Sequence, residues 1–433
     1  MNRPHVGGLS ALLLVIWLVG CSSNATRTTT MSTIPVPGSI TWQHQYRAQI
    51  DQLARRYIAA MTLNQKIGQL IVQGFSTIGY DDEHLRIMQQ IQPGATMWYE
   101  FQMPDVATTR TTIAGVQHDA TLPLLTISDY ETATNADTFQ SMYPLRINST
   151  EISARNDPAF AYSAGKGIAQ DMRSVGMNTD WAPVVDVQTI GYGPDTSGRS
   201  YGSDPQKVAK LAGQVLAGLQ DNGIIGTLKH FPGLGAATVD AHAALPIITK
   251  SRQEWEQVDL VPYRALINGP NPPGMIMGTD VLYPSIDAHL PSELSPIFMT
   301  DILRNELHYD GVVVTDALYM KGITNPTAPY YKGVDQFTAG VMSIQAGCDL
   351  LDTSFTLANS LALVARIKEA LNDGGLTLAR IEQSDLRILR LKIAHGLIPF
   401  HPTSTPPQPQ FFALGQMRLP ERLERSVAPL SAR

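Results

Sequence analysis

The sequence predicts a single-domain α/β fold, a (β/α)8 barrel of the TIM type. Two observations carry this prediction: short apolar runs alternate with helix-like stretches, and there are eight such runs along the 433 residues. Strand–helix alternation is typical of parallel sheets, and single barrels span from about 200 to over 400 residues. Eight units favour a closed barrel over an open sheet.

Taken in order, each predicted strand is a short apolar run. The runs cover 67–73, 95–99, 123–128, 178–183, 224–229, 275–279, 312–315 and 348–351. Helices are predicted between them over 158–175, 205–222 and 295–307, and another begins near Trp42. Thr62-Leu63-Asn64-Gln65 resembles a capping box and therefore predicts a helix start at Thr62.

The two ends of the chain differ from this pattern. The N-terminus resembles a bacterial lipoprotein signal, with cleavage before Cys21 and lipid on its thiol. It has a positive residue, Arg3, an apolar stretch over 12–19, and the sequence Leu18-Val19-Gly20-Cys21. The alternatives are an uncleaved anchor or chance hydrophobicity. We expect a signal peptide over 1–20, a Thr/Ser/Pro-rich tether over 21–41, a folded domain over 42–400 and a Pro-rich tail over 401–433. The protein is then expected in the cell envelope, held to a membrane by Cys21 and facing the periplasm or the exterior.

Composition narrows the possible partners. The formal net charge is -6 and no basic patch stands out, which argues against nucleic acid. Cleavage before Cys21 leaves Cys348 as the last thiol, so no intrachain disulfide can form. Cys348 lies in an apolar run and is expected to be a buried small hydrophobe rather than a nucleophile.

Polar residues follow the predicted strands at the points where these strands end. A single aspartate at such a point is more often a helix cap, but a ring of polar residues is harder to explain that way. In a barrel all these ends open on one face, where the active site lies. The residues are Asp129, Asp186, Lys229, His230, Asp280 and Asp316.

Two of these strand ends carry the groups that glycosidic bond cleavage needs. Lys229-His230-Phe231-Pro232-Gly233 ends one strand and is followed by Asp240-Ala241-His242, while Gly311-Val312-Val313-Val314-Thr315-Asp316 ends another. An acid/base group and a carboxylate would therefore lie at one end of the barrel.

These motifs resemble glycoside hydrolase family 3, in particular its single-domain bacterial β-N-acetylglucosaminidase (β-N-acetylhexosaminidase) branch. The resemblance covers about 63–397, and its six parts occur in family order. They are 61–74, 176–187, 198–205, Lys229 to Gly233 with Asp240-Ala241-His242, Leu282-Tyr283-Pro284 with Leu290-Pro291-Ser292, and 310–316.

The resemblance implies a role for each matching residue. Asp316 is the implied nucleophile and His242 the acid/base, oriented by Asp240. Asp129, Arg199, Lys229 and His230 are the implied sugar-binding residues. A positive charge beside the nucleophile would keep it ionised, and a histidine held by an aspartate can cycle between acid and base near neutral pH.

Plainer roles compete with these. Asp316 could cap a helix, Asp240-Ala241-His242 could be an ordinary surface loop, and Arg199 could pair with Asp186 for structural reasons. Asp280 stands where the family usually has His and stays unassigned.

The chain also departs from the family pattern. The strand-three motif lacks the family's paired glycines and following basic residue, reading Asp129-Tyr130-Glu131-Thr132-Ala133-Thr134, which predicts a loop of another shape. Leu234 replaces a histidine, and Ala317 replaces a second carboxylate.

The resulting expectation is a retaining exo-β-glycosidase that removes terminal β-linked N-acetylglucosamine from peptidoglycan fragments or chitooligosaccharides. No metal or organic cofactor is implied, because water is the only co-substrate. A β-glucosidase or β-xylosidase is the second possibility. A degenerate barrel that binds glycan without cleaving it is the third.

Overall fold

The structure is a computed structural model that describes residues 40–132, 139–143, 147–190, 193, 198–327, 331–402, 408–413 and 415–417. Cys21, the predicted signal, and most of the predicted tether and tail lie outside these residues, so the expectations for them stay predictions. Every element below belongs to one compact unit, which spans residues 36–433.

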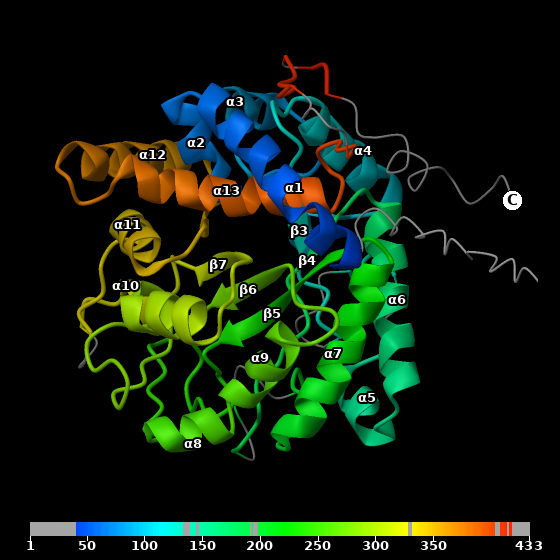
Figure 1. Ribbon diagram of the computed structural model, residues 1–433, viewed down its shortest axis with the longest axis vertical. Coiled ribbons are helices and arrows are strands. Elements are labelled where there is room, and N and C mark those ends of the chain that lie inside the picture. The colour runs from blue at the N-terminus through cyan, green and yellow to red at the C-terminus, as the bar shows by residue number, and fades with distance from the viewer. Residues whose placement is uncertain are drawn as a thin grey trace, which may run out of the picture. The chain divides into compact units, whose positions relative to one another are not determined.

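A closed barrel of parallel strands in sequence order forms the centre of this unit, with β1 pairing β8 (Figure 1). Each of the predicted runs overlaps one strand, so the predicted (β/α)8 barrel is confirmed. The strands are β1 (Ile71–Gln73), β2 (Ala95–Met97), β3 (Leu125–Ser128), β4 (Thr179–Asp180), β5 (Ile225–Phe231), β6 (Met275–Gly278), β7 (Val312–Ala317) and β8 (Leu350–Ser354).

The first predicted strand begins too early. Residues up to Gln69 belong to helix α2 (Leu63–Gln69), and only Ile71–Gln73 form β1. Ile67 is buried like the strand residues that follow it, and a short apolar run does not distinguish a buried helix from a strand. The helix start itself is confirmed, because Thr62 and Gln65 form the predicted capping box.

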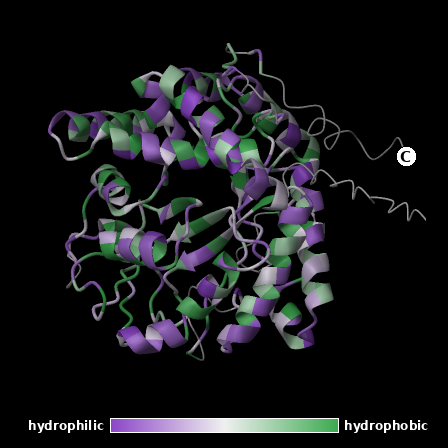
Figure 2. Cartoon of the chain, viewed as in Figure 1, coloured by the Kyte–Doolittle hydropathy of each residue, from purple (hydrophilic) through white to green (hydrophobic). Residues whose placement is uncertain are grey.

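Helices surround the barrel, and they carry both hydrophilic and hydrophobic residues along their length (Figure 2). Two of the predicted helices, α6 and α7, start as their sequences indicate: Asp157 and Asp204 accept hydrogen bonds from first-turn amides, and a proline follows each. The helices are α1 (Ile40–Ala60), α3 (Asp82–Gln90), α4 (Val106–His118), α5 (Ser149–Arg155), α6 (Pro158–Ser174), α7 (Pro205–Asp221), α8 (Arg252–Gln257), α9 (Leu260–Ile267), a π-helix (Ile297–Glu306), α10 (Lys321–Thr324), α11 (Gln336–Ala346), α12 (Leu357–Asn372) and α13 (Leu378–Ala394).

Helices from opposite ends of the described chain lie side by side. In Figure 1, α1 (blue) lies along α13 (orange). A separate apolar cluster joins them, including Trp42 and Leu53 of α1 and Leu389 and Ile393 of α13. The described part of the tail packs there too, since the ring centroids of Phe411 and Tyr57 lie 5.4 Å apart. This part of the tail is therefore held against the barrel.

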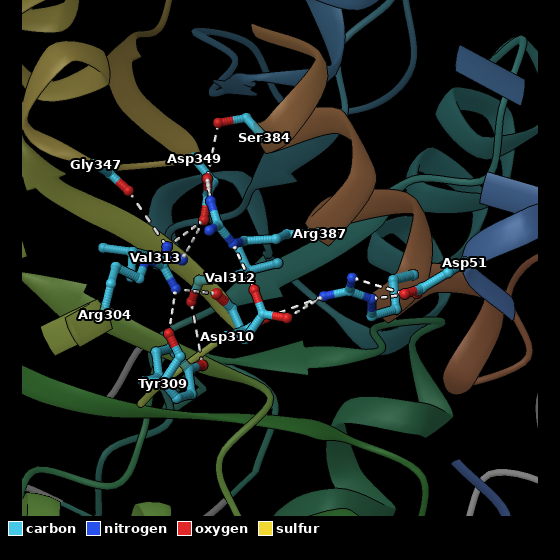
Figure 3. A network of polar contacts seen from close by, with 12 residues as sticks. Asp51, Arg304, Tyr309, Asp310, Val312, Val313, Gly347, Asp349, Ser384 and Arg387 are labelled. Atoms are coloured by element: carbon cyan, nitrogen blue, oxygen red, sulfur yellow. Dashed lines mark hydrogen bonds and ion pairs between the residues drawn. The ribbon is translucent and has the colours of Figure 1, made fainter. Parts of the chain in front are cut away.

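A buried ion network anchors α13 beneath the strands (Figure 3). Asp349, which precedes β8, has a fully buried side chain and contacts Arg304 at 2.6 Å and Arg387 of α13 at 3.2 Å. Asp310, which precedes β7, contacts Arg387 at 3.1 Å and Arg390 at 2.9 Å. The network lies at the amino ends of β7 and β8, opposite the face where a barrel carries its active site.

Among the described residues, no helix has the length and apolar character that a membrane crossing requires. Cys348 is buried and its thiol is free, as predicted.

Candidate active site

A cavity of about 240 Å³ opens at the carboxyl ends of the strands. Six of the seven predicted catalytic and sugar-binding residues line it, and the seventh, Asp240, contacts one of the six. The lining residues are Tyr99, Asp129, Glu131, Trp181, Arg199, Lys229, His230, Leu234, Ala241, His242, Met277, Asp316, Ala317, Tyr319, Met320 and Asp352. Asp280 is buried outside this set.

Two cations and two carboxylates form one side of the cavity. Arg199 binds Glu131 through both carboxylate oxygens, at 2.6 Å each. Lys229 contacts Asp129 at 2.6 Å and also contacts Glu131. Burial alone would raise the pKa of Glu131, but the charges of Arg199 and Lys229 outweigh it and hold that pKa well below its ordinary value. These paired groups present fixed donors and acceptors to the cavity.

His230 and Asp186 hold the Arg199 guanidinium in place. The Nδ1 of His230 lies 2.7 Å from Asp186 Oδ2, and its Nε2 lies 3.1 Å from Arg199 Nη2. A guanidinium can only donate, so Nε2 accepts and the proton of the neutral ring is on Nδ1. Both ring nitrogens thus have protein partners, and we expect His230 to act by orienting Arg199. The structural partner of Arg199 is therefore Glu131, and not Asp186 as the plainer reading of the sequence allowed.

Asp316, near the end of β7, is surrounded by neutral donors. Its Oδ2 accepts from the Thr279 hydroxyl at 2.7 Å, and its Oδ1 accepts from the Ala317 amide at 2.9 Å. Its own amide donates to Glu293 at 2.8 Å. Lys229 and Arg199 line the same cavity, but their ion pairs are with Glu131 and Asp129. The expectation that these cations directly keep Asp316 ionised is therefore not supported by the contacts.

The loop after β5 brings His242 to the cavity mouth. Gly233 turns the chain there with φ of +125°, a backbone conformation that favours glycine. Further along, Asp240 accepts from the His242 amide at 2.8 Å and lies 2.9 Å from its Nδ1. The His242 side chain is 71% exposed, so a departing group and water can both reach it. This is the arrangement that the D-x-H spacing predicts.

Apolar contacts hold this loop against β7. Ala241, Ala317 and Met320 form a small buried cluster. The amide of Gly322, in α10, donates to the Ala241 carbonyl at 3.0 Å. The alanine at 317, where the family pattern has a carboxylate, thus packs beneath the loop that carries His242.

Several cavity residues had no predicted role. Glu131 belongs to the altered strand-three motif, and its position beside Arg199 could not be inferred from spacing. Asp352 follows the last predicted strand directly, so the signal that identified Asp129 and Asp316 could have identified it. Tyr99 and Tyr319 both pack on Phe355, with centroids 5.2 and 5.8 Å away, and form an aromatic wall.

The strand-three loop keeps one feature that glycine normally provides. Thr132 has φ of +63°, in the left-handed region. A β-branched residue there is an outlier that costs energy. At this residue the backbone therefore has a glycine-like conformation without the glycine. Residues 133–138 lie outside the described residues, so the predicted change of loop shape stays a prediction.

Together these groups provide a carboxylate, a solvent-accessible imidazole and a polar wall around one small cavity. That set can attack a carbon, protonate a leaving oxygen and hold a hydroxyl-rich ring.

Relatives of this chain are glycoside hydrolases. It is 32% identical over 250 residues to beta-hexosaminidase A of Pseudoalteromonas piscicida, covering 54% of this chain and 40% of that protein. It is 28% identical over 358 residues to a beta-N-acetylglucosaminidase/beta-glucosidase of Cellulomonas fimi, covering 79% of this chain and 59% of the relative. The chain thus spans about half the length of these relatives.

Solved structures share the fold. The family 3 beta-N-acetylglucosaminidase of Paenibacillus sp. str. FPU-7 superimposes with a TM-score of 0.71 at 27% identity, over 85% of this chain and 68% of that one. A family 3 glycosyl hydrolase of Mycobacterium smegmatis gives 0.69 at 27% identity, over 77% of this chain and 98% of that one. The sequence model of the glycosyl hydrolase family 3 N-terminal domain matches residues 62–391. The chain belongs to glycosyl hydrolase family 3.

Proposed function

We propose that this protein is a retaining exo-β-glycosidase, a β-N-acetylhexosaminidase that releases terminal N-acetylglucosamine from peptidoglycan fragments or chitooligosaccharides. One observation carries the proposal: Asp316 and His242 line a single small cavity that Arg199, Lys229 and their carboxylate partners also line. The names of the relatives support the choice of sugar.

The geometry supports a mechanism in two steps. An Asp316 oxygen bonds to the anomeric carbon as the bond from that carbon to the leaving oxygen breaks, and His242 gives its proton to that oxygen. Water then attacks the same carbon, its proton passes to His242, and the bond to Asp316 breaks. Two displacements at one carbon retain its configuration. The imidazole replaces the second carboxylate of the usual glycosidase pair.

Sugar binding is assigned to the charged wall. Asp129, Arg199 and Lys229 present donors and acceptors at fixed positions, because each forms an ion pair with another residue of that wall. A cavity of about 240 Å³ suits one sugar ring, which supports removal of terminal residues. The aromatic wall of Tyr99 and Tyr319 gives an apolar surface beside it.

Hydrolysis of a panel of nitrophenyl β-glycosides tests this function. We expect the highest kcat/KM on the N-acetylglucosaminide, and a loss of several orders of magnitude in Asp316→Ala with its folding transition unchanged. A higher kcat/KM on the glucoside or xyloside would favour the second enzymatic reading, for which the bifunctional name of the Cellulomonas fimi relative is the supporting observation. Binding of N-acetylglucosamine without hydrolysis of any substrate would favour the degenerate barrel.

We also propose that the protein is held to an envelope membrane by lipid on Cys21. The support is the sequence around Cys21 and the Thr/Ser/Pro-rich stretch after it. Fractionation of cells that express Cys21→Ala tests this. We expect the variant to leave the membrane fraction, whereas full retention would indicate anchoring by an uncleaved apolar segment.

A further inference from the structure

One cavity residue remains outside the mechanism above. Asp352 lies in β8, is 4% exposed, and lines the cavity together with Asp316. In the β7–β8 register its Cα pairs with that of Ala317, the residue after the proposed nucleophile. The family pattern has a carboxylate at 317, so here a carboxyl occupies this level of the cavity from the neighbouring strand instead.

The side chain of Asp352 forms a hydrogen bond with another cavity residue, Tyr99. The backbone of Asp352 has partners of its own. The amide donates to Thr315 Oγ1 at 3.0 Å, and the carbonyl accepts from the Leu318 amide at 3.0 Å. The strand is therefore held by its backbone. A buried carboxyl is costly unless it is paired or functional, and such groups gather at active sites.

Its neighbours favour the neutral carboxylic acid. Burial first, and then the charges of Asp316 on β7 and Asp129 after β3, raise the pKa of Asp352 to about 8, while a hydrogen bond with Tyr99 opposes them. Two more titratable groups, Glu293 and Tyr319, also face this group, and burial raises the pKa of each. At neutral pH Asp352 therefore offers one donor and one acceptor.

We propose that Asp352 is a positioning residue for the terminal sugar, binding the polar substituent on the ring carbon next to the one that Asp316 attacks. This inference rests on the proposed function. Asp352 comes from the strand beside that of Asp316, in register with the next residue, Ala317, and both carboxyls line the cavity. It therefore faces the part of the ring adjacent to the reacting carbon. An acetamido group at that carbon has one donor and one acceptor, which complement those of a neutral carboxyl.

The proposal makes the protonation state matter. Loss of the proton removes the donor and adds a negative charge beside Asp316 and Asp129. Activity that depends on Asp352 should therefore be present below its pKa and decline as pH rises through about 8. The test uses a dinitrophenyl substrate, because its departure hardly needs an acid and kcat/KM then reports little of the state of His242.

The experiment compares three variants on two substrates. Asp352→Asn keeps a neutral donor and acceptor, Asp352→Ala removes both, and Asp301→Asn changes an exposed carboxylate elsewhere on the barrel as the control. The substrates are the dinitrophenyl β-N-acetylglucosaminide and its analogue that lacks any substituent at the neighbouring carbon. Each is measured as kcat/KM across pH.

We expect Asp352→Ala to lose about ten- to a hundredfold on the N-acetylglucosaminide, the scale of one hydrogen bond to a polar group, and to lose little on the unsubstituted analogue. Asp352→Asn should keep most of the activity at neutral pH and lack the decline near pH 8, which wild type and Asp301→Asn retain. Equal losses on both substrates, or an unchanged pH profile in Asp352→Asn, would overturn the proposal. If wild type hydrolyses the N-acetylglucosaminide, such a result overturns only the role of Asp352. If wild type does not hydrolyse it, the proposed function itself fails.

Discussion

Charge in the cavity is distributed residue by residue. Glu131 forms ion pairs with both Arg199 and Lys229. The Thr279 hydroxyl and the Ala317 amide donate hydrogen bonds to the Asp316 carboxylate. Under the proposed mechanism, these two hydrogen bonds position Asp316 for attack on the anomeric carbon.

His242 should matter in proportion to the need for a proton. The sugar alcohol released from a natural oligosaccharide is a poor leaving group and needs a proton as the bond breaks. Dinitrophenolate is a good leaving group and hardly needs one. We expect His242→Ala to lose far more kcat/KM on the oligosaccharide than on the dinitrophenyl glycoside. With the latter, a burst followed by slow turnover should appear, because deglycosylation lacks its base. Asp240→Asn should show a milder form. Equal losses without a burst would assign His242 to sugar binding.

Thr132 should be replaceable by glycine with a gain in stability. Its φ of +63° disfavours a β-branched side chain, and relief of that strain is worth about 1 kcal/mol after the greater flexibility of unfolded glycine is subtracted. We expect Thr132→Gly to raise the midpoint of thermal unfolding. Thr132→Ala, which keeps the Cβ atom but not the branch, is the matched control and should gain less. A lower midpoint for Thr132→Gly would show that the side chain makes contacts worth more than the strain.

At the level of elements, two loops form one unit at the barrel mouth. The loop after β5 carries His242, and the segment after β7 carries Met320 and α10. The Gly322 amide and the Ala241–Ala317–Met320 cluster join them. The distance between His242 and Asp316 is thus set by packing between loops as well as by the barrel.

Restoring the family carboxylate at 317 should therefore harm this protein. Ala317→Asp places a charged group in an apolar contact under the His242 loop, close to Asp316 and Asp352. We expect kcat to fall at least about tenfold, since small displacements of catalytic groups are costly. Ala317→Ser, small and uncharged, should fall less. If Ala317→Asp matched wild type in kcat, the packing of Ala241 on Ala317 would have no part in placing His242.

The elements also show what sequence patterns can and cannot predict. Alternating apolar runs located every strand, because each is buried and short, and the capping box at Thr62 located a helix start. The same patterns placed the start of β1 too early, where a buried helix precedes the strand. Of the polar residues predicted at strand ends, Asp129, Lys229, His230 and Asp316 line the cavity, whereas Asp186 and Asp280 do not. The partner of Arg199 could not be predicted, since Glu131 reaches it through a loop whose path depends on tertiary contacts.

At the scale of the whole barrel, the buried ion network and the candidate active-site cavity lie at opposite ends of the strands. The network around Asp349 and Asp310 ties α13 and α1 to the amino ends of β7 and β8 (Figure 3). The cavity opens at the carboxyl ends. Substitutions in the network should therefore change stability without changing the substrate preference.

The network should make stability sensitive to acid. Burial alone would raise the pKa of Asp349, but Arg304, Arg387 and Arg380 outweigh it and lower that pKa. A lowered pKa in the folded state means that the contribution is present above the unfolded value and is lost as pH falls through the folded one. Asp349→Asn should cost about 3–5 kcal/mol at neutral pH, and wild type should approach the variant in strong acid.

Urea unfolding at neutral and acid pH measures this effect. Glu369→Gln is the control, because Glu369 pairs with Arg366 on an exposed helix face with its side chain 69% exposed. Its cost should be within about 0.5 kcal/mol. A cost for Asp349→Asn as small as that of the control would mean that the buried network contributes little.

The most direct test of the account is to locate the covalent intermediate. An activated fluorinated glycoside that forms the glycosyl-enzyme quickly and releases it slowly should leave a sugar on the protein. Peptide mass spectrometry after digestion is predicted to find that sugar on Asp316, with wild-type protein fully labelled and Asp316→Ala unlabelled. A sugar attached to another carboxylate such as Asp352, or no attachment together with products of inverted configuration, would contradict the account.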